Sequence, residues 1–488
     1  MTSIIDTTST ILSQNTICFD TRDQISNHVP EENMKFGILH LKAINCNQTT
    51  EEVDFLFVVD CSVSMCETCA DGKNKMQHIL HTLKNMIYYF HEYANNNIHI
   101  IVNAFDTKYY SIIKRTKITT ENISEIIHQI NTIAPRGSTN IEFALLKSTE
   151  IIKNLKLDFP TNRINHIFMT DGEATDGSTD VEYLQSILEQ DITNAFIGFG
   201  IQHDSSLLNG ISSFKNGAYY FIDKLENAGF VYGEIIHGIL YKLIHDTEII
   251  VENGLIYNFK TNQWQNNLAI GDIVSEADKI FNIASPTPLE CNVYIKGHIG
   301  NLVYLFPSTF SETADLTSHI YRQRTLQLLF EVYHSCNKKR MKRQTSEILQ
   351  EFDDKTELKN KLAKFMEEMK KYMADNHLED DTFLKNLCDD IYICWRTFGT
   401  TSGTMFCVAR QTSQGQQRQY TVSSIGTIDD EERNSFQFAM SDDELQLQHD
   451  ITNFEDTPYL TPQATQIMRE FSRKDQDDEL SISTRFIN

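Results

Sequence analysis

The sequence contains no stretch of about 18 consecutive apolar residues, the length that a membrane-spanning helix requires. Its first residues, MTSIIDTTSTILSQN, also lack the positively charged start and the apolar core of a secretory signal. The chain has 488 residues, 40% hydrophobic and 23% charged, which suits a folded protein of about two to four domains. We therefore expect a soluble, cytoplasmic protein without a membrane span.

Positive charge is scarce. The 43 lysine and arginine residues stand against 67 aspartate and glutamate residues, and the formal net charge is −24. The one basic cluster in the sequence, KKRMKR at 338–343, is short and lies between two helical patterns, as a solvated loop would. This charge balance predicts no nucleic-acid partner.

Several enzyme motifs are missing from the sequence. No GxxxxGK[ST], GxSxG or HExxH occurs, which argues against the sites that these motifs build. The ten cysteines are scattered along the chain, as expected for thiols in a reducing compartment. Cys66 and Cys69 form a single CxxC, which cannot supply the cysteine and histidine array of a RING-type zinc site.

Short apolar runs alternate with amphipathic helical patterns from about 55 to 243. The runs FLFVV and AFIGFG are apolar throughout, as strands covered by helices on both faces should be. The pattern predicts a doubly wound, mostly parallel α/β domain of the Rossmann-like kind. The five strand candidates are FLFVV, HIIVNAF, HIFMT, AFIGFG and AYYFI.

The segments that flank this domain have other characters. Strand-like runs with asparagine and glycine turns lie before and after it, so we expect a β-sandwich into which the α/β domain is inserted. A helical period follows, and beyond Gly399 the composition is too polar and acidic to fold alone. Within that tail, PYLTPQATQIMREFSR predicts a short helix that docks on this protein or on another. The predicted organisation is a flexible N-terminus (1–34), a β-strand segment (35–50), the α/β domain (53–244), a β-rich domain (248–310), a helical domain (316–398) and a mostly disordered acidic tail (400–488) with a short helix near 461–472.

Oxygen-bearing side chains gather where predicted strands end. Asp60, Ser62 and Ser64 follow FLFVV in DCSVSM, Asp171 follows HIFMT, and Thr139 lies in a glycine-containing loop that opens a helix. Open parallel sheets bind ligands beyond the carboxyl ends of their strands, so the three loops can converge there. We call these five residues the oxygen set. Hydroxyls and carboxylates suit Mg²⁺, with Mn²⁺ or Ca²⁺ as other candidates.

A metal held largely by hydroxyls would keep much of its positive charge and an open coordination position. An aspartate or glutamate of a protein partner would then complete its shell, which predicts a metal-dependent adhesion or adaptor module. Asp106 and Glu173 lie near the oxygen set in sequence, either as hydrogen-bond acceptors behind it or as solvent-facing loop residues.

Three sequence motifs carry a family resemblance. DCSVSM matches the DxSxS motif of the metal-ion-dependent adhesion site of von Willebrand factor A domains, GSTNIEFAL resembles their threonine loop, and MTDGEATDG resembles their aspartate loop, in the family's order. The stretch IGFGIQHDSSLLNG resembles the later elements in the form seen in inter-alpha-trypsin inhibitor heavy chains. The resemblance covers about 53–243 and implies this fold with a metal at the oxygen set. Cys61, Val63 and Ser138 depart from the common pattern at positions that are not ligands.

Two other functions compete with this interpretation. The chain can be a scaffold whose A domain is metal-free and whose helical domain and tail recruit partners. A remote alternative is a magnesium-dependent hydrolase with Asp60 as nucleophile. Such aspartate phosphatases need a second carboxylate two residues later, where this chain has Ser62. We therefore expect a protein that is not an enzyme.

Overall fold

The computed structural model divides into two compact units, which we describe separately. The α/β unit comprises Thr50–Gly200, Ile222–Leu240 and Pro462–Asn488, and the flanking unit comprises Met1–Thr49, Ile201–Phe221 and Tyr241–Thr461. The residues that the structure describes are 11–22, 29–49, 51–69, 72–93, 97–200, 203–222, 228–300, 302–336, 345–398, 403–418 and 459–471.

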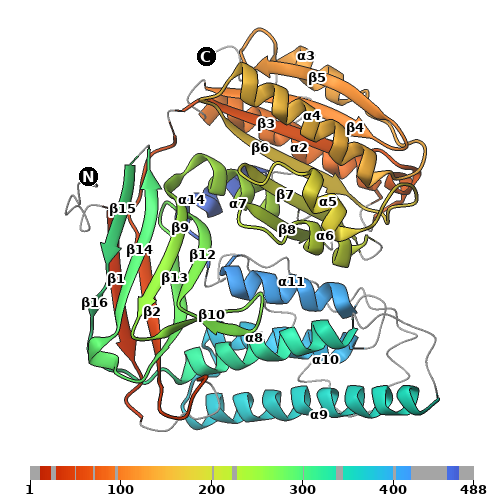
Figure 1. Cartoon of the computed structure of the whole chain (residues 1–488). Coiled ribbons are helices and arrows are strands. Elements are labelled where there is room, and N and C mark those ends of the chain that lie inside the picture. The colour runs from red at the N-terminus through yellow and green to blue at the C-terminus, as the bar shows by residue number, and fades with distance from the viewer. Residues whose placement is uncertain are drawn as a thin grey trace. The chain divides into compact units, whose positions relative to one another are not determined.

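The first six-stranded sheet has the strand order β5-β4-β3-β6-β7-β8 (Figure 1). Strands β3 to β7 belong to the α/β unit, whereas all of β8 except Ile222 groups with the flanking unit. β3 pairs in parallel with β4 and β6, and β6 pairs in parallel with β7. All eight residues of β3 are buried, which explains the apolar run from Phe55 to Val59. The predicted α/β fold is thus confirmed. The strands are β3 (Val53–Asp60), β4 (Ile98–Phe105), β5 (Tyr109–Lys117), β6 (Arg163–Thr170), β7 (Thr193–Phe199) and β8 (Gly217–Ile222).

Strand β5 is missing from the predicted set of strands. It pairs antiparallel with β4 at the edge of the sheet, and only Ile113 along its length is buried. An edge strand of this kind needs no long apolar run, so its sequence YYSIIKRTK resembles a connecting loop.

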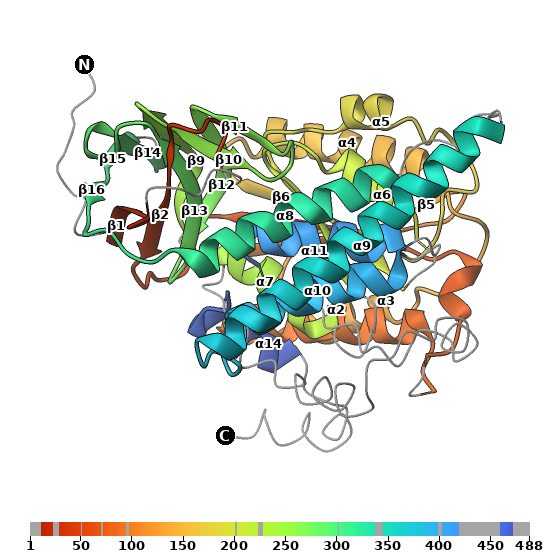
Figure 2. The same cartoon turned by 90° about the horizontal axis from the view of Figure 1, so that it is seen from below.

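Helices cover both faces of this sheet (Figure 1, Figure 2). The amphipathic segment between the first two predicted strands forms α2, and its apolar residues from Met76 to Phe90 on one face are buried. α4 begins at an N-cap, where the Asn140 side chain accepts a hydrogen bond from the Phe143 backbone N–H at 2.8 Å. The helices of the unit are η1 (Val63–Cys66), α2 (Lys75–Tyr93), α3 (Ile123–Ile130), α4 (Ile141–Asp158), α5 (Val181–Ile187), α7 (Ala228–Leu240) and α14 (Pro462–Phe471).

The tail helix α14 packs against α7 and α2 of its own chain. Its apolar face, which includes Ile467 and Met468, is buried. The Phe471 ring meets the Tyr89 ring edge-on at 5.3 Å, and the Asn85 amide donates to the Phe471 carbonyl oxygen at 3.0 Å. Of the two docking sites that the sequence left open, the structure therefore shows the one within this protein.

His166 of β6 is a titratable group inside the core of the α/β unit. Its Nδ1 lies 3.0 Å from Asn194 Oδ1 on β7, while its Nε2 has no hydrogen-bond partner among the described residues. Phe168 and Phe196 meet the imidazole ring edge-on. Burial lowers the pKa of His166 to about 4, so the imidazole stays neutral in the folded chain at pH 7.

Acidification is expected to destabilise the α/β unit less in His166→Leu than in the wild type. Below pH 6.5 the unfolded chain takes up a proton at this histidine, and the folded chain does so only near pH 4. The contribution of the neutral His166 to the free energy of unfolding is therefore fully present above pH 6.5. It falls by roughly 3 kcal/mol as the pH decreases to 4. Urea titrations from pH 7.5 to 4.5 measure it. Other titrating groups are common to both chains, so parallel pH profiles would contradict this assignment.

The flanking unit contains two sheets, ordered β11-β10-β13-β2-β1-β16 and β12-β9-β14-β15 (Figure 1). Two hydrophobic clusters of described residues join them. In the first, Ile17 and Leu39 of one sheet meet Ile249 and Val293 of the other, and in the second, Leu41 meets Ile295. β2 pairs with β13, so strands that precede the α/β unit in sequence pair with strands that follow it. The strands are β1 (Leu12–Phe19), β2 (Lys35–Ala43), β9 (Lys242–Glu252), β10 (Leu255–Asn258), β11 (Gln263–Gln265), β12 (Asn267–Val274), β13 (Asp278–Ser285), β14 (Asn292–Ile299), β15 (Leu302–Pro307) and β16 (Thr309–Phe310).

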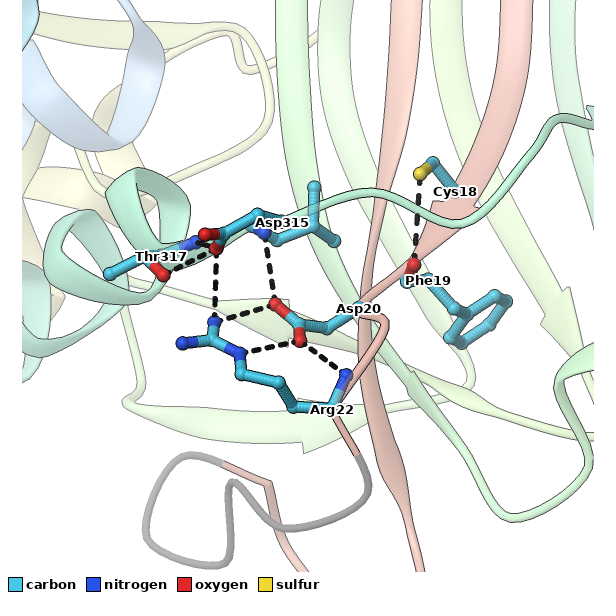
Figure 3. A network of polar contacts seen from close by, with 7 residues as sticks. Cys18, Phe19, Asp20, Arg22, Asp315 and Thr317 are labelled. Atoms are coloured by element: carbon cyan, nitrogen blue, oxygen red, sulfur yellow. Dashed lines mark hydrogen bonds and ion pairs between the residues drawn. The ribbon is translucent and has the colours of Figure 1, made fainter.

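Strand β1 corrects the prediction that 1–34 is a flexible N-terminus. It pairs antiparallel with β2, and Asp20 just beyond it is buried. The Asp20 carboxylate accepts two hydrogen bonds of 2.8 Å from the Arg22 guanidinium (Figure 3). It also accepts one of 2.9 Å from the Leu316 backbone N–H. Arg22 forms a second ion pair with Asp315 at 3.3 Å. The sequence LSQNTICF hides this strand, because only Leu12, Ile17 and Phe19 of its eight residues are buried. Residues 1–10 and 23–28 lie outside the described ranges.

The helices of the flanking unit extend further than predicted. α8, α9 and α10 fall in the predicted helical segment, but α11 lies within 400–488, where disorder was expected. Its residues Phe406 and Cys407 are buried, and the Cys407 thiol donates to the Leu329 carbonyl oxygen at 3.0 Å. Most of the predicted disordered tail lies outside the described residues. The helices are α6 (Ser205–Ile211), η3 (Pro288–Glu290), α8 (Thr317–Cys336), α9 (Thr345–Asp375), α10 (Thr382–Thr397) and α11 (Gly403–Gln416).

Two predicted boundaries also differ from the structure. β9 begins at Lys242, before the predicted start of the β-rich domain at 248. Residues 201–221, predicted to lie in the α/β domain, group with the flanking unit because α6 contacts α11 and the Phe221 ring packs on Phe406 at 5.9 Å. Within the described ranges, no helix is both long enough and apolar enough to cross a membrane.

Candidate functional site

The candidate site lies at the carboxyl ends of β3 and β6. Because these strands are parallel and in register, their ends meet at one edge of the sheet. β3 ends at Asp60 and β6 ends at Thr170, whose hydroxyl donates a hydrogen bond of 2.5 Å to Asp60 Oδ2. Asp171 follows directly, and Thr139 lies just before α4. The fold thus places all three predicted loops on this edge.

A chain of hydrogen bonds joins four members of the oxygen set. The Ser62 backbone N–H donates to Asp60 Oδ1 at 2.7 Å. The hydroxyl oxygens of Ser62 and Ser64 lie 2.9 Å apart, and the Ser64 hydroxyl donates to Asp171 Oδ1 at 2.7 Å. A hydroxyl that donates its one proton keeps its lone pairs, so Ser64 can still accept or coordinate.

Thr139 is the fifth member, and its place is set by the loop after β6. Its hydroxyl oxygen and that of Ser64 lie 3.4 and 3.7 Å from the point that a Cβ on Gly172 would occupy. The Thr139 carbonyl accepts from the Thr175 backbone N–H at 3.0 Å, and the Thr139 N–H donates to the Thr175 hydroxyl at 2.9 Å. Thr175 therefore ties the two loops together. In the sequence, this role is indicated only by the position of Thr175 within TDGEATDG, the loop that follows β6.

The two carboxylates of the oxygen set are both fully buried, at 0% exposure. Burial raises the pKa of Asp60 to about 6, and the nearby charge of Asp171 adds to the rise, while hydrogen bonds from Thr170 and Ser62 oppose it. Among the described residues, both hydrogen-bond donors to Asp60 are neutral. Two buried negative charges favour a cation beside them.

Lys75 belongs to this site although the sequence pattern does not reveal it. Its ammonium donates to Asp171 Oδ2 at 2.8 Å and pairs with Glu67 Oε2 at 2.6 Å. The Lys75 side chain is only 10% exposed, at the first residue of α2. In the sequence it merely precedes a helical stripe, and its partner Asp171 is 96 residues away.

Asp106 and Glu173 do not join the oxygen set. The buried Asp106 carboxylate accepts from the Lys108 N–H at 2.6 Å and the Tyr110 hydroxyl at 3.0 Å, and lies 3.6 Å from the Arg136 guanidinium. Its carbonyl also accepts from the backbone N–H that follows Thr139, so Asp106 supports that loop. Glu173 is exposed to solvent.

The residues that depart from the family pattern differ in exposure. The Cys61 side chain is buried, and burial raises the pKa of its thiol to about 12, so it stays protonated. Val63 is 59% exposed between the two serines, an apolar group at the rim of the site. Cys66 is exposed and Cys69 is half-buried, and neither forms a disulfide bond with another described cysteine.

The donors of the oxygen set fit a hard cation. Within the described residues, no group of three or more histidine, cysteine, aspartate or glutamate side chains is placed to hold a metal ion. The cluster instead combines two carboxylates with three hydroxyls, a donor set that suits Mg²⁺ better than a softer metal. Its two buried, closely spaced negative charges fit a divalent ion.

An open sheet with helices on both faces and polar loops at one edge defines a doubly wound α/β domain with a ligand-binding edge. Residues 54–233 match the model of the von Willebrand factor type A domain family, which confirms the predicted resemblance for this segment. The matched segment is less than half of the 488-residue chain. The likeness to inter-alpha-trypsin inhibitor heavy chains stays a prediction. No curated protein sequence matches this chain.

Solved structures with similar folds come from varied sources. The ArnB paralog VWA2 from Sulfolobus acidocaldarius is 10% identical with a TM-score of 0.48, over 83% of this chain and 99% of that one. A von Willebrand factor type A protein from Catenulispora acidiphila is 12% identical with a TM-score of 0.45, over 66% and 80%. Proximal thread matrix protein 1 from the mussel byssus, described with a zinc-occupied MIDAS motif, is 19% identical with a TM-score of 0.31, over 40% and 47%. Such low values carry no information about function.

Proposed function

We propose that the α/β unit is a divalent-metal-dependent protein-interaction module without catalytic activity. Asp60, Ser62, Ser64, Thr139 and Asp171 would hold the ion, with Mg²⁺ as the first candidate and Mn²⁺ or Ca²⁺ as alternatives. A bound divalent ion would supply an open coordination position for an aspartate or glutamate of a protein partner. The chain then acts as an adhesion or adaptor protein.

The convergence of two fully buried carboxylates and three hydroxyls carries this proposal. Burying two negative charges at one strand edge costs stability unless a cation accompanies them, so a purely structural role would favour apolar or capping residues there. The side chains are also held in place, because Thr170 fixes Asp60 and Thr175 fixes the Thr139 loop. Such support orients the oxygens before any ion binds.

One observation favours the scaffold alternative, in which the A domain is metal-free. The Lys75 ammonium already provides Asp171 with a positive partner at 2.8 Å. The folded unit therefore has one internal cation of its own. Metal titration decides between the two functions.

Mg²⁺ is expected to stabilise the wild-type chain and to leave Ser64→Ala nearly unaffected. An ion at 100 times its Kd adds about 2.7 kcal/mol to the folded state, which corresponds to an increase of roughly 5–10 °C in the Tm of the α/β unit. Calorimetric titration and thermal unfolding, with and without chelator, measure binding. Ser186→Ala is the matched control, because this exposed hydroxyl donates to the Tyr183 carbonyl away from the oxygen set. Equal Mg²⁺ binding by all three chains would exclude the proposed ligands.

The partner chemistry needs a second experiment. Capture from native lysate with Mg²⁺, with chelator and with Asp60→Ala is expected to give partners that are lost in the latter two conditions. Identical partners in all three conditions would support the scaffold. Chelator-sensitive phosphatase activity of the purified chain would instead support the hydrolase.

A further inference from the structure

The Lys75 ammonium is enclosed beside the oxygen set. It lies 2.8 Å from Asp171 Oδ2 and 2.6 Å from Glu67 Oε2, and its Cε and Nζ lie 4.0 Å from the point that a Cβ on Gly200 would occupy. The start of α2, the loop after β6 and the end of β7 therefore surround it. With 10% of its side chain exposed, Lys75 has little freedom to swing into solvent.

The Lys75 ammonium donates to Oδ2 of Asp171. The Ser64 hydroxyl donates to Oδ1 of the same carboxylate at 2.7 Å. Asp171 thus has one oxygen turned to a hydroxyl and one turned to a fixed positive charge. This arrangement keeps Asp171 as the acceptor that orients Ser64.

The negative and positive charges of the buried groups at this edge do not cancel. Asp60 and Asp171 bring two negative charges and Lys75 brings one positive charge, so the three together are singly negative. Glu67 also pairs with Lys75, but it is 46% exposed and water screens its charge. A divalent ion makes the buried group singly positive, whereas without Lys75 the loaded group would be neutral. A positive, poorly hydrated site attracts an outside anion more strongly than a neutral one.

We propose that Lys75 is a specificity-determining residue, a built-in cation that weakens divalent-ion binding and strengthens capture of an acidic partner group by the loaded site. The repulsion between the ammonium and the ion costs metal affinity, and the same uncompensated charge attracts a carboxylate. This inference rests on the proposed function, because it assumes that the oxygen set binds a divalent ion. It adds the residue that favours a carboxylate as the partner group and the cost of that preference in metal affinity.

Lys75→Met tests the two effects, which have opposite signs. The variant keeps the approximate length of the side chain and removes its charge. If Lys75→Met folds poorly, Lys75→Gln is used instead, because it removes the charge and keeps a polar end. Calorimetric titration with Mg²⁺ alone is expected to show roughly tenfold tighter binding. At saturating Mg²⁺, retention on a poly-L-glutamate surface is expected to fall at least threefold relative to the wild type, on the same electrostatic argument.

Lys84→Met is the matched control. Lys84 lies on the same helix, about 13 Å further along its axis at 1.5 Å per residue, which is beyond the screening length in physiological salt. The same loss of charge there is expected to change neither Mg²⁺ affinity nor retention on poly-L-glutamate. Matching changes in both variants would assign the effect to net charge and overturn the role of Lys75.

The remaining outcomes separate this inference from the proposed function. Unchanged or weaker Mg²⁺ binding by Lys75→Met and Lys75→Gln, with normal binding by the wild type, overturns the inference alone. Binding by the variants but not by the wild type supports Lys75 as an opposing cation and rejects the proposed function of the native chain. An absence of binding in every folded variant rejects both.

Discussion

Gly233→Ala is expected to release helix α14 from the α/β unit. A Cβ at Gly233 would lie 2.7 Å from Met468 Cγ, 2.8 Å from Met468 Cα and 2.9 Å from its backbone nitrogen. Two of these atoms are backbone, so no side-chain rotation relieves the overlap. Either α7 and α14 move apart or α14 detaches, and such overpacking costs about 1–3 kcal/mol.

The docking of α14 is sensitive to a change of this size. Burial of Ile467, Met468 and Phe471 favours docking, and the conformational entropy lost on ordering the ten residues of the helix opposes it. The net docking free energy is therefore small, and hydrogen exchange of the amides over Pro462–Phe471 is expected to accelerate about tenfold or more. Mass spectrometry of the intact chain, digested after exchange, measures this rate.

Gly238→Ala is the matched control on the same helix. No atom lies within 4 Å of a Cβ at Gly238. Alanine is favoured over glycine in a helix by about 1 kcal/mol, so this variant is expected to be neutral or slightly stabilising. Exchange rates in α14 that stay at the wild-type level in both variants would show that α14 does not rest on Gly233.

Arg115→Met is expected to destabilise the α/β unit by about 3–5 kcal/mol, because it leaves a buried carboxylate without its cation. Asp54 is fully buried in β3 and accepts from Arg115 Nε at 2.7 Å and from the Asn162 amide at 2.8 Å. The Arg115 guanidinium also stacks on the Phe159 ring, 3.7 Å from its centroid. Methionine keeps part of that contact, so the loss of charge dominates.

Two further variants serve as controls for this measurement. Lys147→Met removes an exposed partner of Glu150, and the loss is expected to be below about 0.5 kcal/mol. Asp54→Leu combined with Arg115→Met removes both buried charges and is expected to recover most of the stability lost in the single variant. Hydrogen exchange of the β3 and β4 amides reports the unfolding free energy of the α/β unit in the full chain. A loss in Arg115→Met no larger than that in Lys147→Met would contradict the buried ion pair.

The interior of the α/β unit was readable from sequence because burial leaves a local pattern. Strand β3 is buried on both faces and is apolar over FLFVV, and α2 buries one stripe at helical spacing. Strand β5 escaped prediction for the opposite reason, since an edge strand with one buried residue carries little pattern. The flanking strand β1 escaped because only three of its eight residues, Leu12, Ile17 and Phe19, are buried, so its sequence carries little apolar pattern.

The oxygen set was predictable because each member follows a recognisable strand or opens a helix. Parallel strands bring their carboxyl ends together, so Asp60 and Asp171 had to meet once β3 and β6 were neighbours. Lys75 was not predictable, because its role depends on how the first turn of α2 lies over the loop after β6. No spacing rule reports such a contact.

The sequence alone determined the class of the α/β unit, its apolar strands and helical stripes, and the five oxygen residues at strand ends and at a helix start. These features depend on local periodicity and on the geometry of parallel sheets. The tertiary structure alone decided that Lys75 faces Asp171, that α14 packs on α7 and that β1 pairs with β16. Those contacts join residues far apart in the chain. Their free energy comes from burial and charge pairing between distant segments, which the pattern of a single segment does not reveal.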